Sequence, residues 1–186
     1  MNMQGNITKA DPITDPNKII AIKEITRDNP RNFALFVVGI NTGFRASDLV
    51  AMKVSDFRGK KVGEKIAIRE QKTKKVRTIT LSQAVYDAVQ PLLTGDDNKP
   101  LFRNADGGKL AVESVIRLVK SWCAKVGLKG NYSSHTLRKT WAHHMYKAGV
   151  NECDLSEALG HASVKQTRIY LGIQPEDVEK MYMIEV

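Results

Sequence analysis

The side chains that could do chemistry in this sequence are arginines, histidines, lysines and tyrosines. His135 and Arg138 stand three residues apart in the segment SHTLRKTWAHHMYKAG, so a helix would project both from one face. Leu137, Trp141 and Met145 would form a neighbouring apolar stripe that anchors this helix. Guanidinium groups bind anionic oxygens, but a His-Arg pair on a helix is more often part of a surface or an interface than of a catalytic site.

A second segment, LGHASVKQTRIYLGI, brings a histidine and a tyrosine close together along the chain. We expect Gly160 to end one helix and Ser163 to cap the next, which places His161 in the turn between them. Tyr170 follows nine residues after His161. The other tyrosines indicate packing, a surface position or, for the one alternative nucleophile Tyr182, a terminal helix; they are Tyr86, Tyr132, Tyr146 and Tyr182.

Several common enzyme signatures are missing from the sequence. It contains no GxxxxGK[ST] loop, no HExxH, no GxSxG and no pair of Cys-x-x-Cys motifs. Nucleotide hydrolysis, zinc hydrolysis and α/β-hydrolase chemistry therefore lack their usual residues. His143 and His144 are adjacent, hence about 100° apart on a helix, and the two cysteines are far apart, so we expect no metal site.

Four segments, taken together, point to a known family. They are TGFRASDL (42–49), EQKTKKVR (70–77), HTLRKTWAHHMYKAGV (135–150) and LGHASVKQTRIYLGI (159–173). In order and spacing they resemble the catalytic domain of tyrosine recombinases of the phage integrase family. The resemblance extends over nearly the whole chain from about Pro16. Four motifs in the same order and spacing make the resemblance very specific, whereas any one motif alone would be weak evidence for it.

The resemblance implies six catalytic residues: the two arginines Arg45 and Arg138, the hairpin lysine Lys72, the two histidines His135 and His161, and the nucleophile Tyr170. Asp48, three residues after Arg45, looks like the family's acidic residue that supports that arginine. Lys74 and Lys75 are neighbours of the lysine on the same turn. Lys72 is preferred because it precedes Thr73, as in the family's Lys-Thr hairpins.

These residue types suit the attack of a phenol on a phosphodiester. Two guanidinium groups can bind the nonbridging oxygens of the transition state without a metal. A free tyrosine has a pKa of about 10, so the same positive field and a nearby histidine must favour loss of its proton, and a lysine can protonate the leaving 5′ oxygen. The product would be a 3′-phosphotyrosyl link, which retains the bond energy for rejoining. We therefore expect a DNA strand transferase that needs no metal, ATP or other cofactor.

Positive charge is concentrated in one part of the chain. Lys and Arg number 29 and Asp and Glu 20, for a net charge of +9, which attracts polyanions. The segment from Lys53 to Arg77 contains ten basic residues and three acidic ones. Such a concentration of positive charge is typical of a surface that binds the phosphate backbone of DNA. We expect double-stranded DNA to be contacted by Arg69, Lys74, Lys75 and Arg77. The other interpretation is a sheet edge whose lysines prevent aggregation.

The pattern of apolar and capping residues predicts a mainly α fold with one small antiparallel β-sheet, the α+β class of the tyrosine recombinase catalytic domain. Helices are expected after the Asp-Pro and Asn-Pro pairs at 15–16 and 29–30, and the β-branched runs around Lys72 predict a hairpin. The remaining predicted helices cover 47–52, 82–92, 111–126, 135–148, 151–159, 163–170 and 175–182.

The length of 186 residues fits one domain, with a polar lead over 1–14 and the catalytic domain over 15–186. The longest apolar stretch, residues 33–40, is shorter than the roughly 20 residues that span a bilayer. The first eighteen residues lack an apolar signal region, so we expect a cytoplasmic protein that binds no membrane. Cys123 and Cys153 are too few for a disulfide framework and are expected to be reduced.

One departure from the family concerns the N-terminal side. Typical integrases carry a helical core-binding domain in front of the catalytic domain, and we expect that domain to be absent here. The chain would then be either an excised catalytic domain or a naturally minimal protein of a phage or other mobile genetic element. Without a core-binding domain to close around the DNA, binding should be weak and sensitive to salt.

The family also implies assembly of four protomers on two DNA duplexes, with weak or no self-association without DNA. Residues 174–186 would dock on a neighbouring protomer or pack on their own domain. Two other functions stay open: a type IB topoisomerase-like relaxation of DNA, and a DNA-binding regulator or decoy that cuts nothing. The presence of every matching catalytic residue argues against the decoy.

Overall fold

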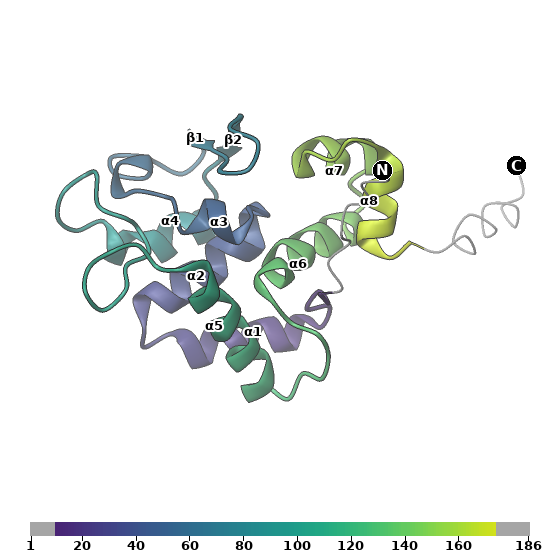
Figure 1. Ribbon diagram of the computed structural model, residues 1–186, viewed down its shortest axis with the longest axis horizontal. Helices are drawn as coiled ribbons and strands as arrows, with labels where there is room; N and C mark the ends of the chain where they lie inside the picture. The colour runs from purple at the N-terminus through teal and green to yellow at the C-terminus, as the bar shows by residue number, and fades with distance from the viewer. Residues whose placement is uncertain (1–9, 174–186) are drawn as a thin grey trace, which may run out of the picture. The chain divides into compact units, whose positions relative to one another are not determined.

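The computed structural model describes residues 10–173, which divide into two compact parts, residues 10–141 and residues 142–173. Figure 1 shows mostly helices with one two-stranded sheet, as predicted. The elements of the first part are α1 (Pro16–Thr26), α2 (Pro30–Thr42), α3 (Ala46–Leu49), the 3-10 turn Val54–Asp56, β1 (Lys65–Arg69), β2 (Val76–Thr80), α4 (Gln83–Val89), the 3-10 turn Gln90–Leu92, α5 (Val112–Lys125) and the start of α6 (Ser134–Lys147). The second part holds the end of α6, α7 (Glu152–Leu159) and α8 (Val164–Leu171).

The first two helices begin at the predicted caps. The Asp15 carboxylate accepts the N–H of Asn17 at 2.8 Å, and the Asn29 side chain accepts the N–H of Asn32 at 3.0 Å. Each cap is followed by a proline, whose missing N–H costs nothing in the first helical turn. Local sequence therefore decides where α1 and α2 start.

One predicted helix is divided. The segment expected to be helical over 82–92 forms α4 up to Val89 and then a 3-10 turn that contains Pro91. Proline has no N–H to donate to the preceding turn and its ring crowds the carbonyl four residues earlier, so the α-helix cannot continue through it.

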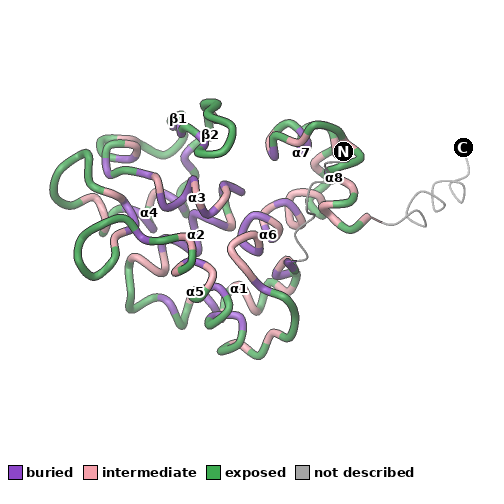
Figure 2. Tube along the Cα trace, viewed as in Figure 1, coloured by how far each residue is buried: buried purple, intermediate pink, exposed green. Residues whose placement is uncertain are grey.

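The hairpin is antiparallel and pairs Ile66 with Ile79 and Ile68 with Arg77. Ile66 and Ile68 are buried, whereas the turn between the strands is exposed (Figure 2). In that turn Lys74 adopts a left-handed φ of 60°, which a non-glycine residue adopts only at some cost. The strands thus anchor an exposed, basic turn to the core.

The core of the first part forms around α2. Phe36 packs edge to face on Trp122 of α5, with ring centroids 5.9 Å apart. Leu137 of α6 lies so close to Gly39 that a Cβ at residue 39 would stand 2.6 Å from its Cδ1. The helix that carries His135 and Arg138 is therefore packed against the C-terminal part of α2, and the apolar stripe predicted for it includes a fully buried Leu137.

In the second part α7 and α8 pack as a helical pair. Gly160 ends α7 with a left-handed φ of 59°, and the Ser163 hydroxyl caps α8 by accepting the N–H of Gln166. Arg168 and Glu152 form an ion pair at 3.3 Å between the two helices. The predicted helix over 175–182 and the alternative nucleophile Tyr182 lie outside the described residues.

No helix within residues 10–173 is both long enough and apolar enough to cross a membrane.

Candidate active site

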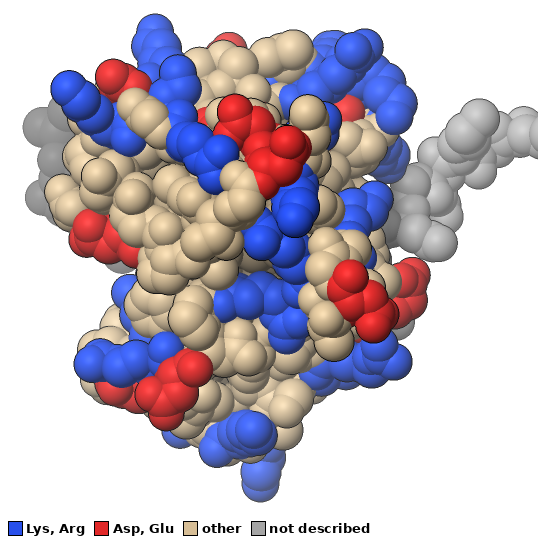
Figure 3. Space-filling view, turned by 90° about the vertical axis from the view of Figure 1, so that its left-hand side faces the viewer, with Lys and Arg blue, Asp and Glu red and all other residues tan. Residues whose placement is uncertain are grey.

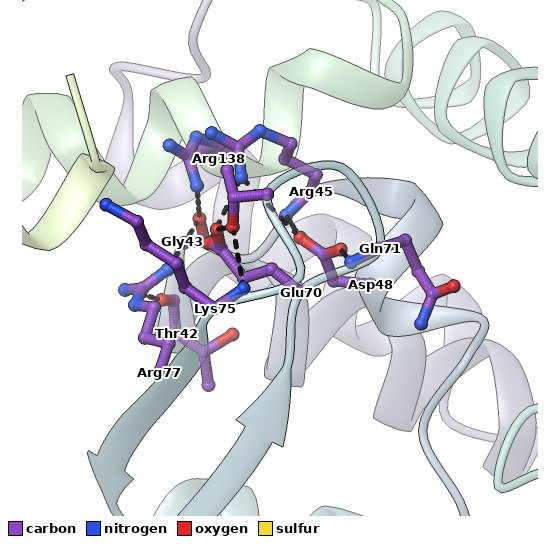
Figure 4. Close-up of polar contacts among 10 residues, drawn as sticks. Thr42, Gly43, Arg45, Asp48, Glu70, Gln71, Lys75, Arg77 and Arg138 are labelled. Carbon is purple, nitrogen blue, oxygen red and sulfur yellow. Dashed lines mark hydrogen bonds and ion pairs between the residues drawn. The ribbon is translucent and has the colours of Figure 1, made fainter. Parts of the chain in front are cut away.

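Arg45 stands at the point where the chain leaves α2 and enters α3. Asp48, which is fully buried, accepts the backbone N–H of Arg45 at 3.3 Å and lies 3.9 Å from its guanidinium. The other oxygen of Asp48 accepts the backbone N–H of Gln71 at 2.7 Å (Figure 4). Asp48 therefore contacts Arg45 and also connects it to the hairpin turn. Its role as the support of a catalytic arginine stays a prediction.

Glu70 is a second acidic support for Arg45. Its carboxylate lies 3.1 Å from the Arg45 guanidinium and accepts the Thr73 hydroxyl at 2.6 Å. Burial by itself would raise the pKa of Glu70, but the Thr73 hydrogen bond and the charges of Arg45 and Arg138 outweigh it and hold this pKa below its ordinary value. Glu70 is thus ionised at neutral pH. Sequence reasoning missed it, and the one signal was an acidic residue within an otherwise basic hairpin.

Arg138 is 2% exposed and projects from the first turns of α6. The helix start is held by Ser133, whose hydroxyl accepts the N–H of His135 at 3.3 Å and whose own N–H donates to the Thr136 hydroxyl at 3.0 Å. The Arg138 guanidinium donates to the carbonyl of Gly43 at 2.7 Å. The two predicted catalytic arginines are thereby linked through the turn Gly43–Phe44–Arg45 (Figure 4).

His135 lies in the electrostatic field of this cluster. Burial lowers its pKa, and the positive charges of Arg138, Arg45, Lys139 and Lys72 lower it further. The imidazole is therefore neutral at pH 7 and can act as a hydrogen-bond donor or acceptor. The charge of the exposed Lys72 is one of the contributions that disfavour the protonated form of this imidazole.

The four residues predicted to contact DNA differ in their surroundings. Arg69, Lys74 and Lys75 are exposed on the hairpin, and they remain predicted DNA contacts. Arg77 is half-buried and its guanidinium donates to the carbonyls of Thr42 at 2.7 Å and Gly43 at 3.3 Å. In the sequence Arg77 is one of several closely spaced basic residues, but the tertiary structure gives its guanidinium two backbone carbonyls to bind.

Basic side chains are prominent on one face of the molecule (Figure 3). On the face drawn in Figure 3, Lys and Arg side chains are spread widely and Asp and Glu side chains occur among them in smaller groups.

Within residues 10–173 no group of three or more His, Cys, Asp or Glu side chains is arranged to hold a metal ion.

The second part carries the predicted tyrosine and its histidine. The rings of His161 and Tyr170 meet edge to face, with centroids 5.1 Å apart and planes at 71°. His161 Nδ1 lies 2.8 Å from the hydroxyl of the buried Thr167, a contact that sets the orientation of the ring. The helix end at Gly160, the N-cap at Ser163 and nearly two turns of α8 produce this arrangement.

The predicted residues therefore form two groups. Arg45, Asp48, Lys72, His135 and Arg138 belong to residues 10–141, and His161 and Tyr170 belong to residues 142–173. Each group is organised by its own contacts, and their meeting at one phosphate remains a prediction.

Comparison with known proteins identifies the family. The model of the phage integrase family matches residues 14–177. The chain belongs to this family. The probable integrase/recombinase YoeC of Bacillus subtilis is 30% identical over 179 residues, which are 93% of this chain and 95% of YoeC. Tyrosine recombinase XerA of Pyrococcus horikoshii is 34% identical over 167 residues, which are 85% of this chain but only 57% of XerA.

Solved structures confirm the fold. The crystal structure of XerA recombinase matches 93% of this chain and 65% of that chain with a TM-score of 0.76 at 24% identity. The XerH site-specific recombinase, crystallised with its palindromic difH substrate after cleavage, matches 98% of this chain and 55% of its own with a TM-score of 0.75 at 22% identity. The chain thus corresponds to a tyrosine recombinase catalytic domain and spans little more than half of several longer members of this phage integrase family.

Proposed function

We propose that this chain is the catalytic domain of a site-specific DNA recombinase that cuts and rejoins strands through a 3′-phosphotyrosyl intermediate. The observation that carries the proposal is the cluster in which Arg45 and Arg138 are linked through one turn and held by Asp48, Glu70 and Gly43 (Figure 4). Ionised guanidinium groups positioned in advance can bind the extra negative charge of a phosphoryl transition state with little reorganisation.

In the proposed step the Tyr170 oxygen attacks phosphorus and the bond from phosphorus to the 5′ oxygen breaks. The phenol proton passes to the imidazole of His161, and the leaving oxygen receives a proton from the Lys72 ammonium. Arg45 and Arg138 bind the nonbridging oxygens throughout, with neutral His135 as a further hydrogen-bond donor. In the reverse step a 5′ hydroxyl attacks the phosphotyrosine, so one ester replaces another and neither metal nor ATP is consumed.

Double-stranded DNA is the proposed partner, and the exposed Arg69, Lys74 and Lys75 are its proposed contacts on the hairpin. Strand exchange needs two duplexes with two cuts on each, which supports assembly of four protomers on DNA. Residues 174–186, which would dock on a neighbouring protomer or pack on their own domain, lie outside the described residues.

A covalent-capture experiment tests the proposal. The purified chain is incubated with a library of duplexes with randomised cores, each nicked so that a cut releases a short fragment and prevents rejoining. We expect a protein–DNA adduct that survives denaturing gels, and the captured duplexes define a cleavable DNA for further work. Tyr170→Phe should abolish the adduct while Tyr146→Phe, from the same part of the chain, should retain it.

Two outcomes would contradict the proposal. DNA binding without any adduct would leave a DNA-binding regulator or decoy. Relaxation of a supercoiled plasmid that lacks every captured sequence would instead indicate a topoisomerase-like activity on a single strand.

A further inference from the structure

Arg77 makes contacts that differ from those of the other basic residues on the hairpin. It projects from β2, and its guanidinium donates to the last carbonyl of α2, that of Thr42 (2.7 Å), and to the carbonyl of Gly43 (3.3 Å). The C-terminal end of a helix carries partial negative charge and unpaired carbonyls, so a guanidinium fork at this place satisfies both. Figure 4 shows Arg77 directed at these two residues.

Two aromatic rings enclose the same group. The Arg77 Cζ lies 4.6 Å from the centroid of Phe44 and 5.6 Å from that of Trp141. Burial, followed by the positive charge of Arg138, lowers the pKa of Arg77 to about 10, against the opposing effect of Glu70. The side chain is still charged at pH 7, but it is held among rings and carbonyls.

The carbonyl of Gly43 is shared. It accepts from Arg77 at 3.3 Å and from Arg138 at 2.7 Å, and Gly43 is two residues before Arg45. One backbone carbonyl therefore connects β2, the turn that carries Arg45 and the helix that carries Arg138.

We propose that Arg77 is a positioning residue that holds the Gly43–Arg45 turn in register with Arg138, and that it does not contact DNA. The inference rests on the proposed recombinase function. Without the Arg77 fork the turn has lost its connection to β2, and Arg45 and Arg138 no longer approach one phosphate at a fixed separation. Misplacement of a catalytic group by about 1 Å can cost about 100-fold in rate.

The test compares Arg77→Lys and Arg77→Met with Arg69→Met, which removes one charge from the exposed side of the same hairpin. Two quantities are measured on the captured DNA: the single-turnover rate of adduct formation at saturating DNA, and the slope of log affinity against log salt. All rates are measured at a temperature well below the thermal unfolding midpoint of each variant, so that unfolding of the variant does not lower the measured rate.

We expect Arg77→Lys and Arg77→Met each to lower the rate by at least 10-fold with an unchanged salt slope, because lysine keeps the charge but cannot bind two carbonyls as a planar fork. Arg69→Met should instead give a salt slope smaller in magnitude by about 1, because one proposed phosphate contact is lost. Should Arg77→Met not fold, Arg77→Gln, which can still donate to one carbonyl, replaces it with the same expected pattern.

A changed salt slope in any Arg77 variant, or a wild-type rate in Arg77→Lys, overturns the inference. Failure of the proposed function is a separate result, because the wild-type chain would then form no adduct with any duplex.

Discussion

Asp48 and Gln71 are joined by a 2.7 Å hydrogen bond from the backbone N–H of Gln71 to the buried carboxylate. The residue that supports Arg45 therefore also holds the turn that carries Lys72, although the two lie in different motifs of the sequence. One side chain thus links the proposed phosphate-binding arginine to the turn that carries the proposed proton donor, Lys72.

Asp48→Asn should destabilise the protein measurably. An asparagine keeps one acceptor oxygen for the two N–H groups of Arg45 and Gln71 and loses the charge beside Arg45. An unsatisfied buried donor costs about 1–3 kcal/mol, which chemical denaturation would detect. Asp56→Asn is the matched control, because Asp56 accepts one N–H, that of Lys53, at a less buried position. Equal losses for the two variants would contradict the double role of Asp48.

Glu70→Gln should lower stability by about 1–3 kcal/mol at pH 7, because Arg45 loses its nearest anion in a largely buried place. The deficit should depend on pH. The pKa of Glu70 lies below its ordinary value of 4.5, so its ionised form stabilises the fold above that pH and the benefit disappears as pH falls through the lower, folded-state pKa. The free energies of unfolding of the wild type and of Glu70→Gln should be measured from pH 7 to pH 3, and the difference between them should become smaller at acid pH. A constant gap would count against the ion pair.

Gly43→Ala should be among the most damaging single-methyl changes in the chain. Gly43 has a φ of +62°, and a Cβ there would lie 2.4 Å from Cε3 of Trp141. The left-handed backbone costs about 1–2 kcal/mol for alanine and the forced displacement of the ring roughly 1–3 kcal/mol more. Gly59→Ala, with a φ of +73° and nothing within 4 Å of the new methyl, should show the backbone cost alone. Thermal unfolding of the two variants side by side provides the measurement.

The His135 imidazole should titrate below its ordinary pKa of 6.5, because burial and then the charges of Arg138, Arg45, Lys139 and Lys72 disfavour its protonated form. Lowering the pH should therefore destabilise the fold through this group, since the unfolded chain binds the proton first. NMR titration of the ring would measure the midpoint directly. Lys72→Ala should raise this midpoint by more than Lys75→Ala does, and the reverse order would favour Lys75 as the lysine of the site.

Lys72→Ala should slow adduct formation by about 100-fold or more, the usual contribution of a general acid. Replacing the leaving 5′ oxygen with sulfur should restore most of the rate, because a thiolate with a pKa near 8.5 leaves without being protonated. At saturating DNA, where weaker binding does not enter the rate, Lys74→Ala should form the adduct at close to the wild-type rate with both DNAs. A Lys72→Ala defect that sulfur does not repair would indicate a role in DNA binding and not in proton transfer.

Much of the architecture depends on interactions within a few residues, and these could be predicted from the sequence. The Asp15 and Asn29 caps, the end of α2 at Gly43 and the turn around His161 are local hydrogen-bonding and backbone preferences. The resemblance of the motifs then placed the catalytic candidates on these elements. The prediction of one helix over 82–92 was wrong because Pro91 has no N–H to donate and cannot continue an α-helix.

The tertiary structure decided which groups satisfy one another across long sequence separations. Arg77 and Lys75 stand two residues apart in one basic run, yet one guanidinium meets two carbonyls from the end of α2 and the neighbouring lysine is exposed. Glu70 lies close to Arg45 because chain folding brings the residues that follow β1 against the start of α3. The charge of a side chain is written in the sequence, but its partner depends on which distant backbone and carboxylate groups packing brings within hydrogen-bond distance.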